Sequence, residues 1–133
     1  MDCLFCKIIA GEIPNHTVYE DDNVLAFLDI HPCCKGHTVL VPKKHLATSL
    51  AATKEEWEKI MEGLRLAIHK VESVIKPDGM NVGINDRPTA GQAVSHMHWH
   101  IIPRFEGDGG GSMHSIVRPK ENVDVKSIAE MFK

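Results

Sequence analysis

Histidines alternate with apolar residues in the segment SHMHWHIIPR, residues 95–104. His96, His98 and His100 occupy every second position, and large apolar side chains stand between them. Because side chains alternate across a β-strand, the pattern predicts a strand over residues 96–102. We expect its histidines to share one face as a functional surface, and its apolar residues to join the core on the other face.

Other stretches of the sequence indicate an α+β fold. Apolar residues recur at steps of three and four from Thr53 to Ile75, which predicts an amphipathic helix over residues 53–76 that Pro77 ends. Together with residues 96–102, β-rich runs predict a mainly antiparallel sheet of about five strands, and a last segment predicts a short C-terminal helix. The β-rich runs are residues 18–19, 24–28, 37–42 and 80–85, and the last segment is residues 123–132. We expect a single domain, residues 1–133.

The composition limits the classes of partner. The chain of 133 residues is 43% hydrophobic and 25% charged, with a net charge of −3, which is typical of a soluble globular protein. Capture of DNA or RNA needs clustered Lys and Arg, and membrane spans need roughly 20 apolar residues in a row; the sequence has neither. No basic leader precedes an apolar segment. We therefore expect no nucleic-acid or membrane partner, and a cytoplasmic location.

Three imidazoles on one strand face suit two kinds of chemistry. Two of them can bind a zinc ion that activates water, with a third ligand and an open position. Alternatively, the middle imidazole attacks phosphorus while its neighbours orient it and stabilise charge on a phosphate oxygen. The segment AGQAV, residues 90–94, favours phosphate because a glycine permits close backbone approach.

Five motifs in order resemble the histidine triad (HIT) family. They are CLFCKIIAGEIP, VYEDDNVLAFLDI, GHTVLVPKKH, GQAV and HMHWHIIPR, and they extend over about residues 3–106. The sequence is most similar to the branch of purine nucleoside phosphoramidases and dinucleoside polyphosphate hydrolases. The resemblance implies a HIT-like fold, a homodimer and no organic cofactor. It also implies a nucleotide hydrolase or transferase that forms a nucleotidyl-histidine intermediate and releases a nucleoside monophosphate.

The same resemblance assigns roles to individual residues. His98 matches the nucleophile, His100 the histidine that contacts a phosphate oxygen, and His96 the first histidine of the triad. His37 matches a further histidine that joins the triad from a neighbouring strand, and Asp29 the carboxylate that holds the ribose hydroxyls, although a turn aspartate is the alternative. The remaining matches are Phe5, Ile8, Phe27, Leu28 and Ile30 in the base pocket, Asn85 on the phosphate side, and Gly91 with Gln92 in the backbone approach to phosphate.

Ala93 departs from the family pattern. Family members commonly carry Ser or Thr at this nucleotide-binding position, two residues after the glycine that Gly91 matches. The missing hydroxyl removes a hydrogen bond to phosphate or leaving group worth roughly 1.5–3 kcal/mol. A nucleotide-binding protein with little turnover therefore remains an alternative, beside a zinc-dependent hydrolase that uses the triad as metal ligands.

The cysteines indicate a second site. Cys3 and Cys6 have the two-residue spacing that lets both thiolates reach one tetrahedral ion, but this pair is only half of a site. His45 and His96 would complete a Cys2His2 set, and the resemblance implies a structural zinc at these positions. His96 would then bind zinc while His98 stays free for chemistry. The adjacent Cys33 and Cys34 are predicted to be free thiols.

Overall fold

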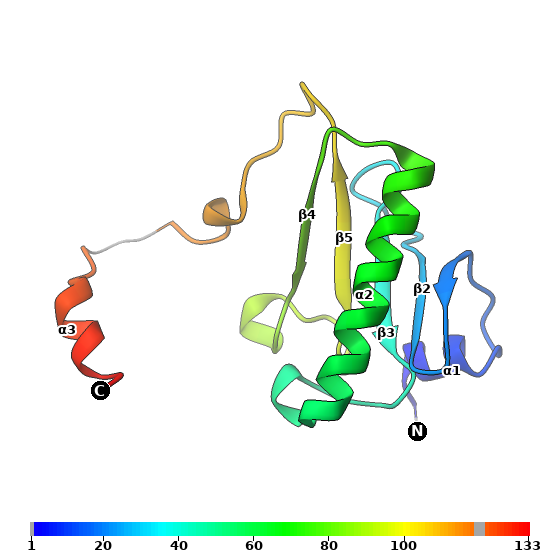
Figure 1. Ribbon diagram of the computed structural model, residues 1–133, viewed down its shortest axis with the longest axis horizontal. Coiled ribbons are helices and arrows are strands. Elements are labelled where there is room, and N and C mark those ends of the chain that lie inside the picture. The colour runs from blue at the N-terminus through cyan, green and yellow to red at the C-terminus, as the bar shows by residue number, and fades with distance from the viewer. Residues whose placement is uncertain (1, 119–121) are drawn as a thin grey trace.

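The computed structural model describes residues 2–118 and 122–133 and has an α+β architecture (Figure 1). Its sheet has five strands in the order β1-β2-β3-β5-β4, and every neighbouring pair is antiparallel. The predicted fold class is therefore confirmed. In chain order the elements are α1 (Leu4–Ile9), β1 (Thr17–Glu20), β2 (Val24–Leu28), β3 (Thr38–Pro42), η1 (Ser49–Ala51), α2 (Lys54–Ile75), β4 (Gly79–Ile84), η2 (Pro88–Ala90), β5 (Trp99–Arg104), η3 (Met113–Ile116) and α3 (Val125–Glu130).

The long helix α2 lies across one face of the sheet (Figure 1). The Thr53 side chain caps it by accepting a hydrogen bond of 3.2 Å from the Glu56 N–H. Residues spaced three and four apart on one side of α2 are buried against the strands, so the predicted helix and its apolar stripe are confirmed. The core on this face contains Val24, Ala26, Leu40, Leu46, Ile60, Leu64, Ala67, Val71, Met97 and Ile101.

The short helix α1 covers part of the opposite face. Its buried residues Phe5 and Ile8 pack on side chains of β2 and β3, namely Leu25, Phe27, Val39 and Val41. α1 has no signal in the sequence, because six residues are too few to display a helical period. The part of this face that β4 and β5 form lies under a pocket and not under α1.

Two expectations for the histidine segment are corrected. The predicted strand 96–102 begins only at Trp99, because β3 pairs with β5 as far as Trp99 and the Met97 N–H bonds instead to the Leu46 carbonyl, at 2.6 Å. The histidine face is not an open surface. His96 is fully buried and His98 is 6% exposed, since the Phe5 ring of α1 packs edge-on against both imidazoles. The alternation itself persists, with Met97 and Ile101 in the core under α2.

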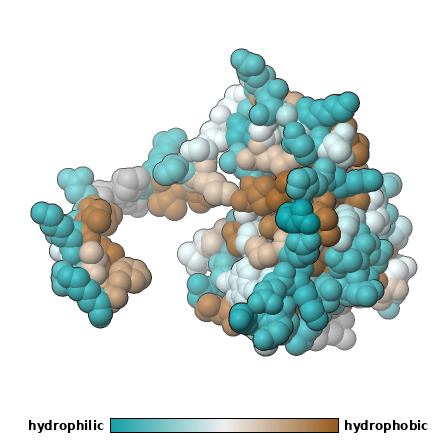
Figure 2. Space-filling view, in the orientation of Figure 1, coloured by the Kyte–Doolittle hydropathy of each residue, from teal (hydrophilic) through white to brown (hydrophobic). Residues whose placement is uncertain are grey.

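Residues 122–133 stand clear of the sheet. Figure 1 shows α3 away from the rest of the molecule, and Figure 2 shows apolar side chains along this segment. These exposed residues include Val125, Met131 and Phe132. The short C-terminal helix was predicted, and α3 confirms it. None of the helices in the described part of the chain combines the length and apolar character that crossing a bilayer requires.

Candidate active site and metal centre

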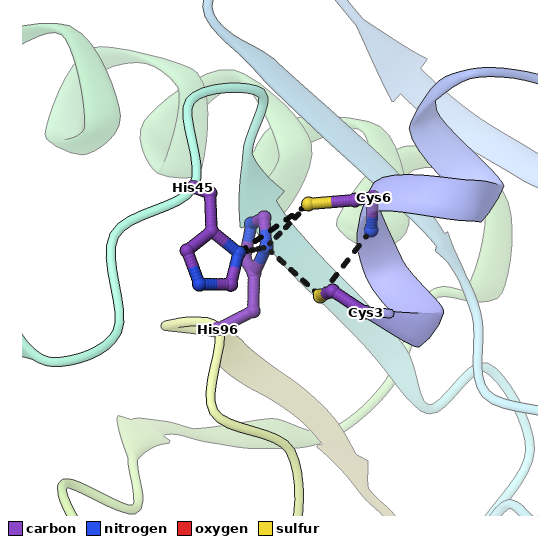
Figure 3. A group of neighbouring side chains, drawn as sticks. All are labelled: Cys3, Cys6, His45 and His96. Carbon is purple, nitrogen blue, oxygen red and sulfur yellow. Dashed lines mark hydrogen bonds between the residues drawn. The ribbon is translucent and has the colours of Figure 1, made fainter. Parts of the chain in front are cut away.

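Two cysteines and two histidines from three distant segments converge at the N-terminal end of α1 (Figure 3). We call Cys3, Cys6, His45 and His96 the Cys2His2 cluster. Cys3 is the N-cap of α1, His45 follows β3 and His96 precedes β5. The His45 Nδ1 lies 3.3 Å from the Cys6 Sγ and 3.2 Å from the His96 Nδ1. The His96 Nδ1 lies 3.5 Å from the Cys3 Sγ and 3.6 Å from the Cys6 Sγ.

These separations fit one tetrahedral zinc ion. Zn–S bonds of about 2.3 Å and Zn–N bonds of about 2.05 Å give tetrahedral edges of about 3.5 Å between S and N and about 3.3 Å between two nitrogens. The His96 Nε2 lies 2.8 Å from the Pro42 carbonyl oxygen, so it must carry the proton and donate. The His96 Nδ1 lone pair is therefore directed at the cluster, an orientation typical of histidines that bind metal. Burial lowers the pKa of His96, which also favours the neutral ligand form.

His98 is held in a different tautomer. Its Nδ1 lies 2.8 Å from the His96 carbonyl oxygen and must donate to it. In the neutral imidazole, Nε2 is then unprotonated and carries a lone pair. The Phe5 ring packs edge-on against the imidazole with centroids 5.0 Å apart, which limits rotation of His98. The geometry thus gives His98 a fixed orientation and a nucleophilic nitrogen.

A chain of hydrogen bonds fixes the two remaining histidines. The Cys33 N–H donates to the His37 Nδ1 at 3.2 Å, so neutral His37 carries its proton on Nε2. That N–H faces the His100 Nδ1 at 2.9 Å and donates to it. Neutral His100 therefore carries its own proton on Nε2, as a hydrogen-bond donor. The His98 and His100 rings are adjacent, with centroids 5.3 Å apart, so an unprotonated imidazole nitrogen lies beside a neutral donor.

Burial keeps this histidine pair neutral. It lowers the pKa of His37, opposed by the nearby Asp29 carboxylate. Burial also lowers the pKa of His100 to about 4, with smaller contributions from His98 and His37. Protonation of the His100 Nδ1 would remove the acceptor for the His37 Nε2–H. The hydrogen-bond chain is therefore expected to persist at neutral pH and to fail in acid.

We expect this burial to make stability depend on pH between about 4 and 6.5. The unfolded His100 has an ordinary pKa near 6.5, so the unfolded chain binds more protons than the folded one in this window, and the free energy of unfolding rises with pH. His100 alone contributes up to about 3 kcal/mol across the window. Urea unfolding from pH 4 to 7 should show this slope in wild type and a smaller one in His100→Gln. Equal slopes in the two proteins would contradict the prediction.

Asp29, His37 and His100 form a second group that could hold an ion. Its geometry does not favour one. A metal on the His37 Nε2 would force the proton onto Nδ1, where it would face the Cys33 N–H. The group does not include His96 or His98. The His96 Nδ1 belongs to the Cys2His2 cluster, and the His98 Nδ1 donates to the His96 carbonyl. The zinc-hydrolase alternative, with the triad as metal ligands, therefore lacks a common centre for its three imidazoles.

Some of the residues expected around the nucleotide base lie in one cluster, and the others lie apart from it. Phe5, Ile8 and Phe27 belong to one buried cluster on the α1 face, beside His98. Leu28 follows Phe27 in β2, so strand alternation puts it on the opposite face. Ile30 lies beyond the strand and is 76% exposed.

Asp29 makes the turn interaction that was one of its two interpretations from the sequence. Its Oδ1 accepts a hydrogen bond of 2.8 Å from the His31 N–H, which is a turn interaction. Its Oδ2 lies 3.7 Å from the His37 Nε2. One carboxylate oxygen therefore supports the loop after β2, and the other faces the histidine chain.

The loop before His96 contains both paired and unpaired backbone N–H groups among the described residues. Gly91 has a φ of 98°, which suits glycine. Its N–H and that of Gln92 already donate to the Pro88 and Arg87 carbonyls, at 2.9 and 3.2 Å. Among the described residues, the N–H groups of 93–95 have no such acceptor. The N–H groups of 93–95 are therefore candidate donors to a phosphate, and the expected backbone approach at Gly91 and Gln92 stays a prediction.

The Gln92 side chain holds this loop in place. Its Oε1 accepts from the Arg87 N–H at 2.6 Å, and its Nε2 donates to the carbonyls of Ala47 and Val94 at 2.7 and 2.9 Å. Arg87 has a positive φ of 74°, which a non-glycine residue adopts only under constraint. The Gln92 amide is thus already used by the loop and is not available to a ligand.

Several features of the site had no signal in the sequence. The Pro42 and His96 carbonyls and the Cys33 N–H set the histidine tautomers, and any residue could provide such backbone groups. A cavity of about 730 Å³ also lies over β4 and β5 and includes Asn85, His37 and His100 in its lining. The floor of this cavity, from β4 and β5, and its lid, from η3, come together only when the strands pair.

Known proteins resemble this chain over most of its length. The HIT domain family model matches residues 10–107. An uncharacterized HIT-like protein of Methanocaldococcus jannaschii is 44% identical over 131 residues, which are 98% of this chain and 98% of that protein. The crystal structure of a HIT family member from Bacillus subtilis has a TM-score of 0.84 and 38% identity, and the match covers 99% of this chain and 95% of that one.

Two further likenesses concern chemistry. Adenylylsulfatase HINT3 of Arabidopsis thaliana is 35% identical over 123 residues, which are 92% of this chain and 62% of that protein. The crystal structure of a zinc-bound histidine triad family protein from Mycobacterium smegmatis has a TM-score of 0.73 and 40% identity, covering 82% of this chain and 79% of that one. The similar proteins thus include a named hydrolase and a zinc-bound structure.

Proposed function

Because this chain belongs to the HIT family, we propose that it cleaves purine nucleotides at the α-phosphate through a covalent nucleotidyl-histidine. The substrates would be nucleoside phosphoramidates, acyl-adenylates or dinucleoside polyphosphates. The observation that carries the proposal is the His98 tautomer, in which the His96 carbonyl binds Nδ1–H and leaves a lone pair on Nε2. The likeness to an adenylylsulfatase supports a hydrolase that acts on an adenylyl compound.

The proposed reaction has two displacement steps. The His98 Nε2 attacks the α-phosphorus, a P–N bond forms, and the bond to the leaving group breaks. The leaving group departs with that electron pair, and an amine takes up a proton from solvent. Water then attacks the phosphorus, the electron pair of the P–N bond returns to Nε2, and water loses a proton to solvent. The products are a nucleoside monophosphate and neutral His98.

Neighbouring groups stabilise the charges that develop in these steps. While Nε2 is bonded to phosphorus, the His98 imidazole is cationic, and its Nδ1–H bond to the His96 carbonyl strengthens. The His100 Nε2–H and the unpaired N–H groups of residues 93–95 are donors for the phosphate oxygens. Ala93 contributes its N–H but no hydroxyl, so the site depends on backbone donors at that position.

A mass measurement tests the covalent step. Protein in small molar excess is mixed with adenosine 5′-phosphoramidate, and the mixture is denatured without acid and examined by intact mass spectrometry. Wild type should carry a transient adenylyl adduct that His98→Ala lacks. Release of adenosine monophosphate in a single turnover with no adduct at any time would reject the covalent mechanism. Binding with neither adduct nor product would favour a nucleotide-binding protein instead.

We also propose a structural zinc in the Cys2His2 cluster. The preformed separations, the His96 lone pair and the likeness to a zinc-bound HIT protein support it. When bound, zinc would hold α1 to the segment before β5, which carries His98. No step of the proposed reaction passes through this ion, so its role is to position the nucleophile.

A homodimer is the assembly we propose. β4 is an edge strand with one unpaired side, and the C-terminal segment exposes apolar residues such as Val117, Val125 and Phe132. A second copy would cover both. Sedimentation equilibrium at micromolar concentration should give twice the chain mass in wild type and a lower mass after Val125→Asp and Phe132→Asp together. A mass of one chain for wild type would contradict the proposal.

A further inference from the structure

Two adjacent cysteines lie outside the Cys2His2 cluster, and their thiols have no part in the proposed reaction. Cys33 is exposed and Cys34 is half-buried. Both residues line the cavity over β4 and β5. Adjacent side chains of an extended chain point in opposite directions, so this convergence on one cavity comes from the turn in which the two cysteines lie. The two thiols therefore face the same space.

The backbone holds both cysteines in this arrangement. The Cys33 N–H donates to the His37 Nδ1 at 3.2 Å, and the Cys34 carbonyl accepts a hydrogen bond of 3.3 Å from the His37 N–H. Gly36 completes the turn with a φ of 86°, a conformation that glycine adopts without strain. The Cys34 S–H also donates to the Pro103 carbonyl of β5, at 3.2 Å. The pair is thus preorganised by the loop and by the sheet.

Cys34 keeps its proton at neutral pH. Burial raises the pKa of its thiol, and the neighbouring Cys33 thiol and the Asp108 carboxylate raise it further, against the opposing effect of Arg104. Arg104 is itself occupied, because its guanidinium donates to both Asp108 oxygens, at 2.7 and 2.8 Å. A thiolate at Cys34 is therefore costly. A ligand that suits this pair removes the thiol proton as it binds.

The pair does not provide the ligands of an ordinary metal site. In the part of the chain that the structure describes, neither of the residue groups that could hold an ion includes Cys33 or Cys34. A tetrahedral zinc ion needs four ligands. The Asp108 carboxylate is no ready third ligand, because it already accepts from Arg104 and from the N–H groups of Phe105 and Gly110. The pair thus suits a centre that needs only two bonds from the protein.

A disulfide between the two cysteines is strained. The Cα atoms of adjacent residues lie about 3.8 Å apart, closer than the roughly 4.4–6.8 Å of ordinary disulfides. One further atom between the sulfurs removes the need for the short S–S bond. The geometry therefore favours an atom that bridges the thiols over a bond between them.

We propose that Cys33 and Cys34 form a binding site for trivalent organoarsenicals, in which one arsenic atom bridges the two sulfurs. For an oxide R–As=O, two S–As bonds form, the arsenic–oxygen bond breaks, and both thiol protons leave with the oxygen as water. Arsenic remains trivalent, so no oxidant or reductant takes part. The adduct is neutral, which suits a site where the charges of Arg104 and Asp108 already pair. The group R can lie in the cavity of about 730 Å³.

The site is one hydrogen bond away from the histidine pair. The Cys33 N–H sets the His37 tautomer, and the His37 Nε2–H donates to His100. Bridging the two thiols turns the backbone at Cys33 and so changes the donor at the His37 Nδ1. We expect the imidazole nitrogen chemical shifts of His37 and His100 to change when the arsenical binds. Unchanged shifts of both rings at full occupancy would overturn this coupling.

Peptide mapping of the full chain locates the arsenical. The folded protein is treated with an equimolar amount of phenylarsine oxide and digested with trypsin, and the peptides are weighed. Cleavage after Lys7 and Lys35 separates residues 8–35, which contain Cys33 and Cys34, from the cysteines of the Cys2His2 cluster. One phenylarsenic group should lie on residues 8–35, and 2,3-dimercaptopropanol should remove it where 2-mercaptoethanol at the same thiol concentration does not. No adduct, or an adduct only on residues 1–7, would overturn the proposal.

Three variants of the turn test the two-bond arrangement. Cys33→Ser and Cys34→Ser each leave one thiol, and both should bind phenylarsine oxide at least about 100-fold more weakly than wild type, because the second, intramolecular bond is lost. Lys35→Ala changes an exposed side chain next to the pair and should keep the wild-type affinity. Calorimetry measures the three affinities. Wild-type affinity in either serine variant would show that one thiol suffices and would overturn the bridge.

A synthetic peptide tests whether the fold builds the site. Residues 30–38 carry the same two thiols without the contacts of the folded chain. The folded protein should bind phenylarsine oxide on the order of tenfold more tightly than this peptide, because its thiols are already directed at one space. Equal affinities would overturn the claim that the tertiary structure preorganises the pair.

Discussion

His98→Ala is expected to lower kcat for hydrolysis of adenosine phosphoramidates by at least about 10⁴-fold. The imidazole holds an Nε2 lone pair in place at the candidate phosphate site, and alanine offers no atom that can bond to phosphorus. Removal of a nucleophile typically abolishes the covalent path and leaves only the contribution of binding and charge stabilisation. Steady-state hydrolysis followed by chromatography of the released amine and monophosphate measures the loss.

Binding and folding controls separate this effect from damage to the site. His98→Ala should still bind adenosine monophosphate in calorimetry, because the proposed base contacts and N–H donors remain. His69→Ala removes an exposed histidine of α2 far from these groups and should retain the wild-type rate. Retention of more than about a tenth of the wild-type kcat by His98→Ala would assign the nucleophile elsewhere.

Cys6→Ser is expected to lower the thermal midpoint by at least about 10 °C. The Cys2His2 cluster joins α1 to distant segments of the folded chain. Because zinc binds this cluster only when the chain is folded, losing zinc removes its binding free energy from the stability of the fold. Burial raises the pKa of the Cys6 thiol, which makes a deprotonated Cys6 costly in the absence of a cation. Scanning calorimetry of zinc-loaded proteins measures the change, with metal content determined in parallel.

Cys33→Ser is the matched control, because Cys33 is an exposed cysteine outside the cluster. It should keep both the zinc content and the thermal midpoint of wild type. Equal midpoints for the two variants, with no zinc in wild type, would reject the structural zinc. Chelation also separates the two roles of zinc. If the ion is structural, activity falls only as the fold loosens. If the ion is catalytic, activity is lost while the fold stays intact.

The sheet and the long helix were predictable because each has a repeating local pattern. The apolar stripe after Thr53 and the alternation around His100 both depend on side-chain direction within one element, which the residue order alone specifies. The end of a strand depends instead on its partner. β5 begins at Trp99 rather than His96 because β3 pairs with it only from there on.

The candidate site was predictable in its residue types more than in its contacts. Cys3, Cys6, His45 and His96 do converge as expected, and His37 does meet His100. The N–H groups of Gly91 and Gln92 donate within the turn, whereas those of 93–95 have no backbone acceptor among the described residues, because the hydrogen bonds of a turn follow from its conformation. The remaining nucleotide contacts, including those of Asp29 and Asn85, stay predictions until a ligand tests them.

The sequence by itself determined which reactive groups the chain carries: histidines spaced two apart, a CxxC pair, and family motifs in order. Only the tertiary structure decided which ring nitrogen of each histidine carries the proton. A histidine is a ligand, a nucleophile or a donor according to which ring nitrogen holds its proton, and that depends on the group opposite the other nitrogen. The Pro42 carbonyl, the His96 carbonyl and the Cys33 N–H set these protons here, and the Pro42 carbonyl lies 54 positions along the chain from the histidine that it binds.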